Sequence, residues 1–565
     1  MKRALLVALS ICVAACAGER SPQYHQKLVV IGIDGLDPDL VSQFMDAGKL
    51  PNMRRLSKEG ALQRLETTPS ADMSAWASFA TGTNPGKHGV FGNEPHPQRR
   101  GSAFWTLAGQ AGVRSSVLAV PMTFPPENVP NGEMLSGWPT PDFRDTPGVY
   151  TFFSTDTPIK DDGRPVGGGV RHRLNFNDGV VHTRLAGPQD ATAPLSIFWN
   201  REGKSATLDV DGTSIRLEEG EWSKWVPIDF NRSWFAPNRG MIEFCLVRAG
   251  SSFALYASPI HWKPDHPPAP LSSPASLSSD LYERVGPFRT LGWAEATAAL
   301  GDGVIDEKAF MDDVSRAFDD RAQIILQRLD TRRWDLLVGE VDSLDRVQHV
   351  MWRLTDPAHP AYDRAAAAKF GDVIEQLYRR CDDLLGEIVK HAGADATIVM
   401  LSVYGEHGVA QTFDLNRWLS AENLPGSATA AANGAITLDA PARTAEDHLI
   451  ARLTALLDPA TKAPIISAVY KRGAVYTGPA AAAAPDLQVG FVPGYGIAPA
   501  PTVFAPNRRK WSADHAGFDY RSVPGTLLSS RPTTTDSPRV IDIAPTVLRY
   551  FGVPIPNEID GTPLF

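Results

Sequence analysis

The chain has 565 residues, which is longer than one ordinary domain and enough for one large core with an insertion. Its composition, 43% hydrophobic and 21% charged, is that of a soluble globular protein. The formal net charge of -9, without a long run of lysine or arginine, argues against a nucleic-acid partner, because phosphate backbones are bound by concentrated basic surfaces.

The first residues have the pattern of a secretory signal. Lys2 and Arg3 precede an apolar run over 4–15 that is too short to span a bilayer as a mature helix. The stretch VAAC, ending at Cys16, resembles the bacterial lipobox, which implies cleavage before Cys16 and lipid on this residue; an ordinary signal peptide with an incidental cysteine is the alternative. We expect a signal peptide over 1–15, a tether over 16–26, and a periplasmic or cell-surface lipoprotein; Ala17 favours the outer membrane.

Two further cysteines, Cys245 and Cys381, lie far apart in the sequence. They could pair in an oxidising compartment. Lone cysteines in a chain of this length are more often buried and free, and we expect that state.

The strand and helix pattern begins with KLVVIGI over 27–33, a continuous apolar run typical of a buried parallel strand. Asp34 ends it, and Asp37 with Pro38 predicts the start of a helix that ends at Gly48. Similar strands are predicted over 334–341, 396–401 and 487–492, and helices over 307–329 and 365–392. This alternation predicts an α/β fold: a doubly wound, mostly parallel sheet sandwiched by helices.

The pattern changes over 142–275, where apolar and polar residues alternate between Asp-Gly and Gly-Ser turns. This predicts an antiparallel β insertion within a core formed by 27–141 and 276–565. Four tryptophans gather in the insertion: Trp199, Trp222, Trp225 and Trp234. They fit a substrate lid, a partner surface or, at least as well, the aromatic core of the insertion.

Acidic residues and histidines recur in four clusters, most of them directly after predicted strands. The members are Asp34; Asp345 with His349; Glu406 with His407; and Asp514 with His515. No single cluster is specific, but the i, i+4 spacing of Asp345 and His349 lets both face one ion. Mixed carboxylate and imidazole ligands suit zinc, manganese or iron, and two ions about 4 Å apart would clamp a phosphoryl displacement.

Several motifs together resemble the alkaline phosphatase superfamily, most closely its type I phosphodiesterase/nucleotide pyrophosphatase branch. They are VVIGIDGLD, TGTNPGKHG, DRVQHVMW, GEHG, KWSADH and DIAPTVLRYFGVPIPNEIDG, and the resemblance covers 27–100 and 276–565. It implies two divalent ions, usually zinc, with manganese or calcium as alternatives. One ion would be held by Asp345, His349 and His515. The other would be held by Asp34, the Glu406-His407 pair and the nucleophile.

The resemblance also implies that Asn93 donates to a phosphate oxygen, although a plain turn residue is the alternative. Two positions depart from the family pattern. Glu406 stands where the family has aspartate, which moves a ligand oxygen by about a bond length. Asp72, nine residues before Thr81, stands where the family has a nucleophilic threonine or serine.

Asp72 leaves three mechanisms open. It can be a metal ligand while a hydroxide attacks, it can be phosphorylated itself, or the site can be silent. Ser74 as a shifted nucleophile and Asp72 as a simple helix N-cap are further alternatives. With an aspartate at position 72, the site has four carboxylates, whose four negative charges balance two divalent ions. They are Asp34, Asp72, Asp345 and Glu406. Metal binding is therefore expected to survive the replacement of the family's hydroxyl by Asp72.

The sequence therefore predicts a metal-dependent hydrolase acting on a small phosphate ester or phosphodiester, with sulfate and phosphonate esters also open. A protein of another class is the alternative: a catalytically silent, metal-binding surface lipoprotein whose β insertion binds a glycan, lipid or protein.

Overall fold

The structure is a computed structural model that describes residues 24–69, 72–92, 98–156, 168–230 and 239–565. The expected signal peptide, Cys16, Asn93 and Trp234 lie outside these residues, as does the side chain of Asp72.

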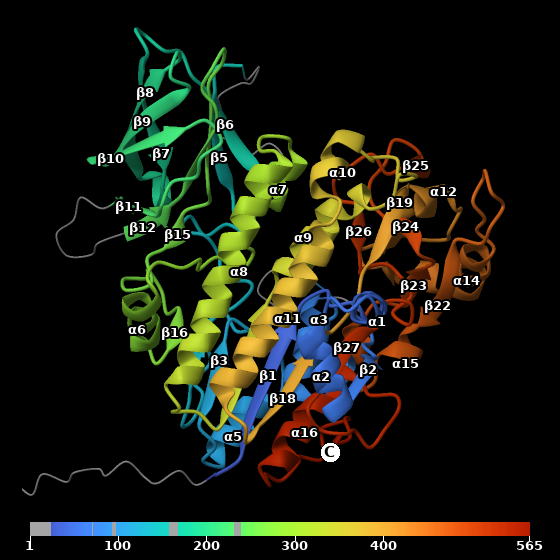
Figure 1. The fold of residues 1–565 in the computed structure, drawn as a ribbon. Coiled ribbons are helices and arrows are strands. Elements are labelled where there is room, and N and C mark those ends of the chain that lie inside the picture. Colours follow the sequence, from blue (N-terminus) through green and yellow to red (C-terminus); the bar gives the residue numbers. More distant parts are fainter. Residues whose placement is uncertain (1–23, 70–71, 93–97, 157–167, 231–238) are drawn as a thin grey trace, which may run out of the picture.

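A sheet of eight strands forms the centre of the molecule (Figure 1), in the order β16-β4-β3-β17-β1-β18-β27-β2. Strands β4, β3, β17, β1 and β18 run parallel, while β16, β27 and β2 join through antiparallel pairs. Their bounds are β1 Lys27–Ile33, β2 Ala61–Leu65, β3 Ser115–Leu118, β4 Glu133–Leu135, β16 Ser272–Ser273, β17 Leu336–Val341, β18 Ala396–Leu401 and β27 Gly525–Ser529.

Strand β1 shows why this sheet is buried on both faces. Val29 and Ile31 belong to one hydrophobic core, and Leu28 and Val30 belong to a second. Side chains alternate between the two faces of a strand, so a continuous apolar run supplies both cores. The predicted α/β fold with a doubly wound, mostly parallel sheet is confirmed.

Helices cover both faces of the sheet. The first core includes residues of α1 Pro38–Asp46, α2 Pro51–Glu59, α8 Glu307–Asp330, α9 Ser343–Met351 and α11 Val373–Ala392. The second includes residues of α3 Asp72–Thr81, α5 Phe104–Gln110 and α16 Ile543–Tyr550. Shorter helices are α4 Pro85–His88, α6 Ser276–Val285, α7 Thr297–Gly301 and α10 Arg364–Phe370.

Two predicted elements need correction. The expected helix over 365–392 is two helices, α10 and α11, which separate at Gly371 and Asp372. The expected strand over 487–492 exists as β23 Leu487–Phe491, but it pairs antiparallel in a separate small sheet, not in the main sheet. Its apolar run is buried by a third core, and burial alone does not tell which sheet a strand joins.

The part of the chain around β23 packs beside the main sheet. The separate sheet has the order β20-β21-β23-β22. Its other strands are β20 Ala428–Ala430, β21 Ala435–Leu438 and β22 Ile466–Lys471; the helices nearby are α12 Leu415–Ala421, α13 Ala440–Arg443, α14 Glu446–Thr454 and α15 Arg472–Val475. A second small sheet joins β19 His407–Phe413 to β24 Gly494–Ile497, β25 Phe504–Pro506 and β26 Ala513–Asp514.

The region over 142–275 is rich in strands and extends from one end of the main sheet (Figure 1). It contains β5 Tyr150–Ser154, β6 Gly169–Arg173, β7 Val180–Ala186, β8 Thr192–Asn200, β9 Ser205–Val210, β10 Thr213–Glu218, β11 Val226–Asp229, β12 Arg239–Ile242, β13 Phe244–Arg248, β14 Ala254–Ala257 and β15 His261–Trp262. All their ladders are antiparallel except β5 with β6. Strand β16, at the end of the range, belongs to the main sheet.

The tryptophans Trp199, Trp222 and Trp225 of this region are half-buried. Trp199 donates to the carbonyl of Ala249, and Trp222 donates to the carbonyl of Ala309 at the start of α8. Both rings also contact other aromatic rings. Trp199 thus fits the aromatic-core interpretation, whereas Trp222 and Trp225 line a cavity between the strand-rich region and α8.

Cys245 and Cys381 are free and buried, as expected, and burial raises the pKa of each thiol to about 12. Among the described residues, no helix combines the length and the apolar character needed to cross a membrane.

Candidate metal centre

Three predicted ligands meet beyond the carboxyl ends of β1, β17 and β18. Asp345 and His349 lie one turn apart on α9, which follows β17 directly. His515 follows β26, whose residue Asp514 pairs with His407 at the start of β19. The carboxyl ends of parallel strands are the usual place for a site in an α/β sheet.

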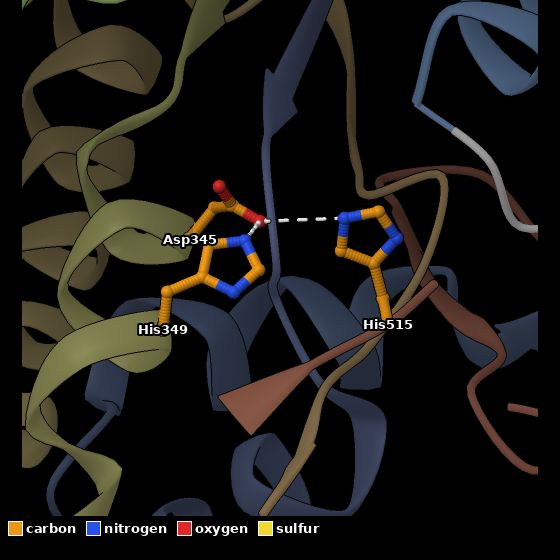
Figure 2. A group of neighbouring side chains, drawn as sticks. All are labelled: Asp345, His349 and His515. Atoms are coloured by element: carbon orange, nitrogen blue, oxygen red, sulfur yellow. Dashed lines mark ion pairs between the residues drawn. The ribbon is translucent and has the colours of Figure 1, made fainter. Parts of the chain in front are cut away.

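Figure 2 shows how these side chains face one another. Nε2 of His349 lies 3.3 Å from Oδ1 of Asp345, and Nε2 of His515 lies 3.9 Å from the same oxygen. One ligand atom from each residue lies within 4.8 Å of the others, and all three side chains are buried. This spacing lets one ion contact all three.

A backbone carbonyl fixes the orientation of the His349 ring. Its Nδ1 lies 2.8 Å from the carbonyl of Ala513, which can only accept a hydrogen bond. The proton of a neutral ring is therefore on Nδ1, and the lone pair on Nε2 points toward Asp345 and His515. A histidine held in this way by a carbonyl is typical of metal ligands.

Asp345 is oriented by a neighbour that the sequence did not single out. Arg346 donates to its Oδ2 and also pairs with Asp342 at 3.5 Å. Burial opposes ionisation of Asp345, but His349 and Arg346 outweigh it, so its pKa lies well below the usual range. Asp345 is thus an anion with Oδ1 turned toward the histidines.

Glu406 lies against the same group. It is fully buried, its Oε2 is 3.8 Å from Nδ1 of His349, and no described group donates a hydrogen bond to either oxygen. Burial, and then the charge of Asp345, raise the pKa of Glu406 well above its ordinary value. Burying an ionised carboxylate without hydrogen-bond donors beside a second carboxylate is unfavourable. A divalent cation bound between the two would offset this free-energy cost.

Asp34 has other partners. The indole of Trp76 donates to Oδ1 at 3.2 Å, and the hydroxyl of Tyr404 donates to Oδ2 at 3.0 Å. The Tyr404 ring also stacks on His515, with centroids 3.6 Å apart and planes 7° apart. Sequence reasoning missed Tyr404, although its place just ahead of Glu406 in YGEHG was a signal.

The Nε2 atom of His407 contacts a backbone carbonyl. Its Nε2 lies 2.8 Å from the carbonyl of Ser522, and its ring meets Phe518 edge-on. The described residues therefore bring together Asp345, His349, His515 and Glu406, and leave His407 directed at a backbone carbonyl.

The expected nucleophile position, Asp72, is the first residue of α3. Ser74, the alternative nucleophile, is fully buried, and its hydroxyl donates to the carbonyl of Val90 at 2.9 Å. This geometry does not favour Ser74 as the attacking group.

Two tryptophans cover one side of the group. Trp511 stacks on His349 with centroids 4.0 Å apart, and its side chain stays partly exposed. Trp293 lies over the guanidinium of Arg346 at 3.5 Å. These rings hold the ligands and reduce the access of water, which strengthens charge interactions inside the site.

The donor set fits a divalent ion. Two imidazoles and a carboxylate converge, the first histidine has the tautomer of a ligand, and a second carboxylate beside them lacks donors. Nitrogen and oxygen donors of this kind suit zinc, manganese or iron.

Comparisons with known proteins agree with the motifs. A family profile described as type I phosphodiesterase / nucleotide pyrophosphatase matches residues 28–143 and 225–502. No curated protein sequence matches the chain.

Solved structures of similar fold include phosphonoacetate hydrolase from Sinorhizobium meliloti in complex with phosphonoformate, at 12% identity and a TM-score of 0.46, covering 92% of this chain and 94% of that chain. Murine ectonucleotide pyrophosphatase/phosphodiesterase 5, in an inactive form in complex with AMP, has 11% identity and a TM-score of 0.44, covering 94% of this chain and 96% of that chain.

Proposed function

The chain belongs to the type I phosphodiesterase/nucleotide pyrophosphatase family, and on this premise we propose that it hydrolyses small phosphate esters or phosphodiesters with the help of a divalent ion. The observation that carries the proposal is the buried convergence of Asp345, His349 and His515 at the carboxyl edge of the sheet. A divalent ion held there would supply positive charge to a phosphoryl oxygen and to the attacking group.

The chain's own residues prepare the site in three ways. The carbonyl of Ala513 sets the tautomer of His349, and Arg346 keeps Asp345 ionised and turned inward. Stacking on Tyr404 orients His515. A constellation held in this way needs little rearrangement when the substrate binds.

Asp72 remains the position that decides the chemistry. We propose that it acts as an anionic group at the start of α3 and that water, not Asp72, attacks phosphorus. Its support is the family pattern, which has a hydroxyl at this position, and the weak nucleophilicity of a carboxylate. Asn93 is proposed to donate to a phosphate oxygen, and zinc is the proposed ion, with manganese and calcium as alternatives.

The remaining predictions from the sequence are proposals of the same kind. The signal over 1–15 and the lipobox cysteine support an outer-membrane lipoprotein anchored through Cys16, with its tether over 16–26. The pattern change along the chain supports a catalytic unit formed by 27–141 and 276–565 with a β insertion over 142–275.

One experiment tests the function. The detergent-purified full chain is assayed with aryl phosphate monoesters and diesters in zinc, manganese or calcium, beside His349→Ala and the surface control His448→Ala. We expect at least a hundredfold loss for His349→Ala and no change for His448→Ala. Wild-type protein that binds metal and hydrolyses none of these esters would contradict the proposal and favour the silent surface module.

A comparison of Asp72→Thr with Asp72→Ala separates the mechanisms. If water attacks, both variants retain turnover, and no phosphorylated protein accumulates in the wild type during a quench with labelled substrate. A trapped acyl phosphate on Asp72 would show that Asp72 itself attacks.

A further inference from the structure

We propose that the chain carries a second ligand site, separate from the metal centre, which binds a neutral oligosaccharide. The site is a cavity of about 1230 Å³ between the strand-rich region and α8. Its lining comes mainly from 218–225, which lead from β10 into β11, and from 308–323 on α8, together with the buried residues Glu243 and Arg289. Pockets for one small molecule enclose about 300 to 1,000 Å³ and often form between domains, so this cavity has room for an extended ligand.

Two half-buried tryptophans supply the apolar part of the wall, and both are held in place. Nε1 of Trp222 donates to the carbonyl of Ala309 at 3.1 Å, so its ring bridges the two sides of the cavity. The guanidinium of Arg316 lies 4.3 Å from the centre of the Trp222 ring, and that of Arg289 lies 5.5 Å from the Trp225 ring. A rigid indole offers the apolar C–H groups of a sugar ring a large contact area at little cost in conformational entropy.

Most charged groups of the wall are paired with one another or with an immediate neighbour. The pairs are Arg289 with Glu243 and Asp320, Arg316 with Glu243, Lys308 with Asp312, Arg380 with Asp319, and Arg216 with Glu218, at 2.6 to 3.0 Å. Of the charged lining residues that the structure describes, Glu219, Glu221 and Lys224 are in none of these pairs, and all three are exposed. A ligand with many charges of one sign would therefore find few counter-charges that are not already used.

Paired charges can still form hydrogen bonds with an uncharged ligand. A carboxylate has lone pairs beyond those that one cation uses, and a guanidinium has five N–H donors. A hydroxyl group is both donor and acceptor, so a sugar can bind carboxylate and guanidinium alike without bringing a charge. Paired charges beside fixed indoles therefore favour a neutral oligosaccharide over a phosphate ester, a nucleic acid or a basic peptide.

Binding of three neutral hexasaccharides tests the inference: cellohexaose, maltohexaose and N-acetylated chitohexaose. Isothermal titration calorimetry on the detergent-purified full chain should detect one site per chain for at least one of them. We expect about tenfold weaker binding in Trp225→Ala, because aromatic anchors dominate the energy of most binding sites. Trp199→Phe is the matched control and should bind as the wild type does, because its ring packs against Phe176 and Phe253. No binding of any of the three would overturn the inference.

A blocking experiment covers the case in which Trp225→Ala does not fold. Gln323 is exposed on α8 and lines the cavity, and the thiols of Cys245 and Cys381 are buried, so fluorescein maleimide should label Gln323→Cys at position 323. We expect the labelled variant to bind the saccharide about tenfold more weakly than the same variant without label. Circular dichroism before and after labelling confirms that the fold is unchanged.

The remaining outcomes would overturn the inference. Unchanged affinity in folded Trp225→Ala, or after labelling at position 323, would place the saccharide elsewhere on the molecule. Tighter binding of spermine or of hexagalacturonate than of the neutral hexasaccharides would show that the cavity selects for charge. These measurements do not depend on ester hydrolysis, so they stand or fall independently of the proposed function.

Discussion

At the scale of single residues, Glu295 shows how burial controls charge beside the site. It is buried, accepts a hydrogen bond from the hydroxyl of Ser343, and lies near Asp342. Burial, and then the charge of Asp342, raise its pKa to about 7. Between its ordinary pKa and about 7, the folded chain keeps a proton that the unfolded chain has released, so the free energy of unfolding falls as the pH rises.

Glu295→Gln removes this dependence, because glutamine still accepts from Ser343 but does not ionise. We expect equal stability of variant and wild type near pH 4.5, and a variant that is more stable by about 2 to 3 kcal/mol at pH 8. Urea unfolding at the two pH values measures the difference. Glu283→Gln, on the exposed side of α6, is the control and should show no such trend; equal destabilisation of Glu295→Gln at both pH values would contradict the prediction.

At the scale of elements, the contact between β1 and α3 depends on the absence of a side chain. A Cβ added at Gly32 would lie 2.4 Å from Cη2 of Trp76, which is buried. The close approach lets the indole reach Asp34 at the end of β1. The glycine in VVIGIDG is therefore required by packing, and not only by the turn that follows it.

Gly32→Ala should lower the free energy of unfolding by about 1 to 3 kcal/mol, because the added methyl overpacks a core without space. Thermal and urea unfolding measure the loss. Gly473→Ala in α15 is the matched control: its new Cβ meets no atom within 4 Å, and its effect should stay within about 0.5 kcal/mol. If Gly32→Ala were as stable as Gly473→Ala, the prediction would be wrong, because α3 could then move away from β1 without loss of stability.

At the scale of the whole molecule, a buried ion cluster joins the strand-rich region to the helical core. Arg289 pairs with Glu243 and with Asp313 at 2.8 Å, and with Asp320 at 2.9 Å. Glu243 lies between β12 and β13, while the two aspartates lie on α8. Hydrophobic residues of both parts also share one core.

Arg289→Met should cost about 3 kcal/mol, because Asp320 loses this ion pair while Glu243 and Asp313 are left with their pairs to Arg316. We expect a lower unfolding midpoint and faster proteolysis within 142–275. Arg284→Met, which removes an exposed pair with Asp280, is the control and should cost less than about 1 kcal/mol. If Arg289→Met and Arg284→Met lowered the free energy of unfolding by similar amounts, the ion cluster would not stabilise the contact between the strand-rich region and the helical core.

Much of the fold was predictable because it rests on local patterns. The run over 27–33 forms β1, Asp37 caps α1 as expected, and the i, i+4 pair Asp345 and His349 lies on one helix. The split between α10 and α11 was missed because a single glycine is often tolerated in a helix, and β23 was misplaced because a buried run does not identify its neighbours.

The sequence by itself determined the fold class, the family motifs and three residues that now form the candidate metal centre, because strand ends and helical spacing are local properties. Only the tertiary structure decided which atoms meet. It turned His407 toward Ser522, bound Asp34 to Trp76 and Tyr404, and placed Arg346 behind Asp345. The reason is physical: side-chain direction is set by the packing of the whole fold, in which Tyr404 meets Asp34 across 370 positions and Ser522 meets His407 across 115.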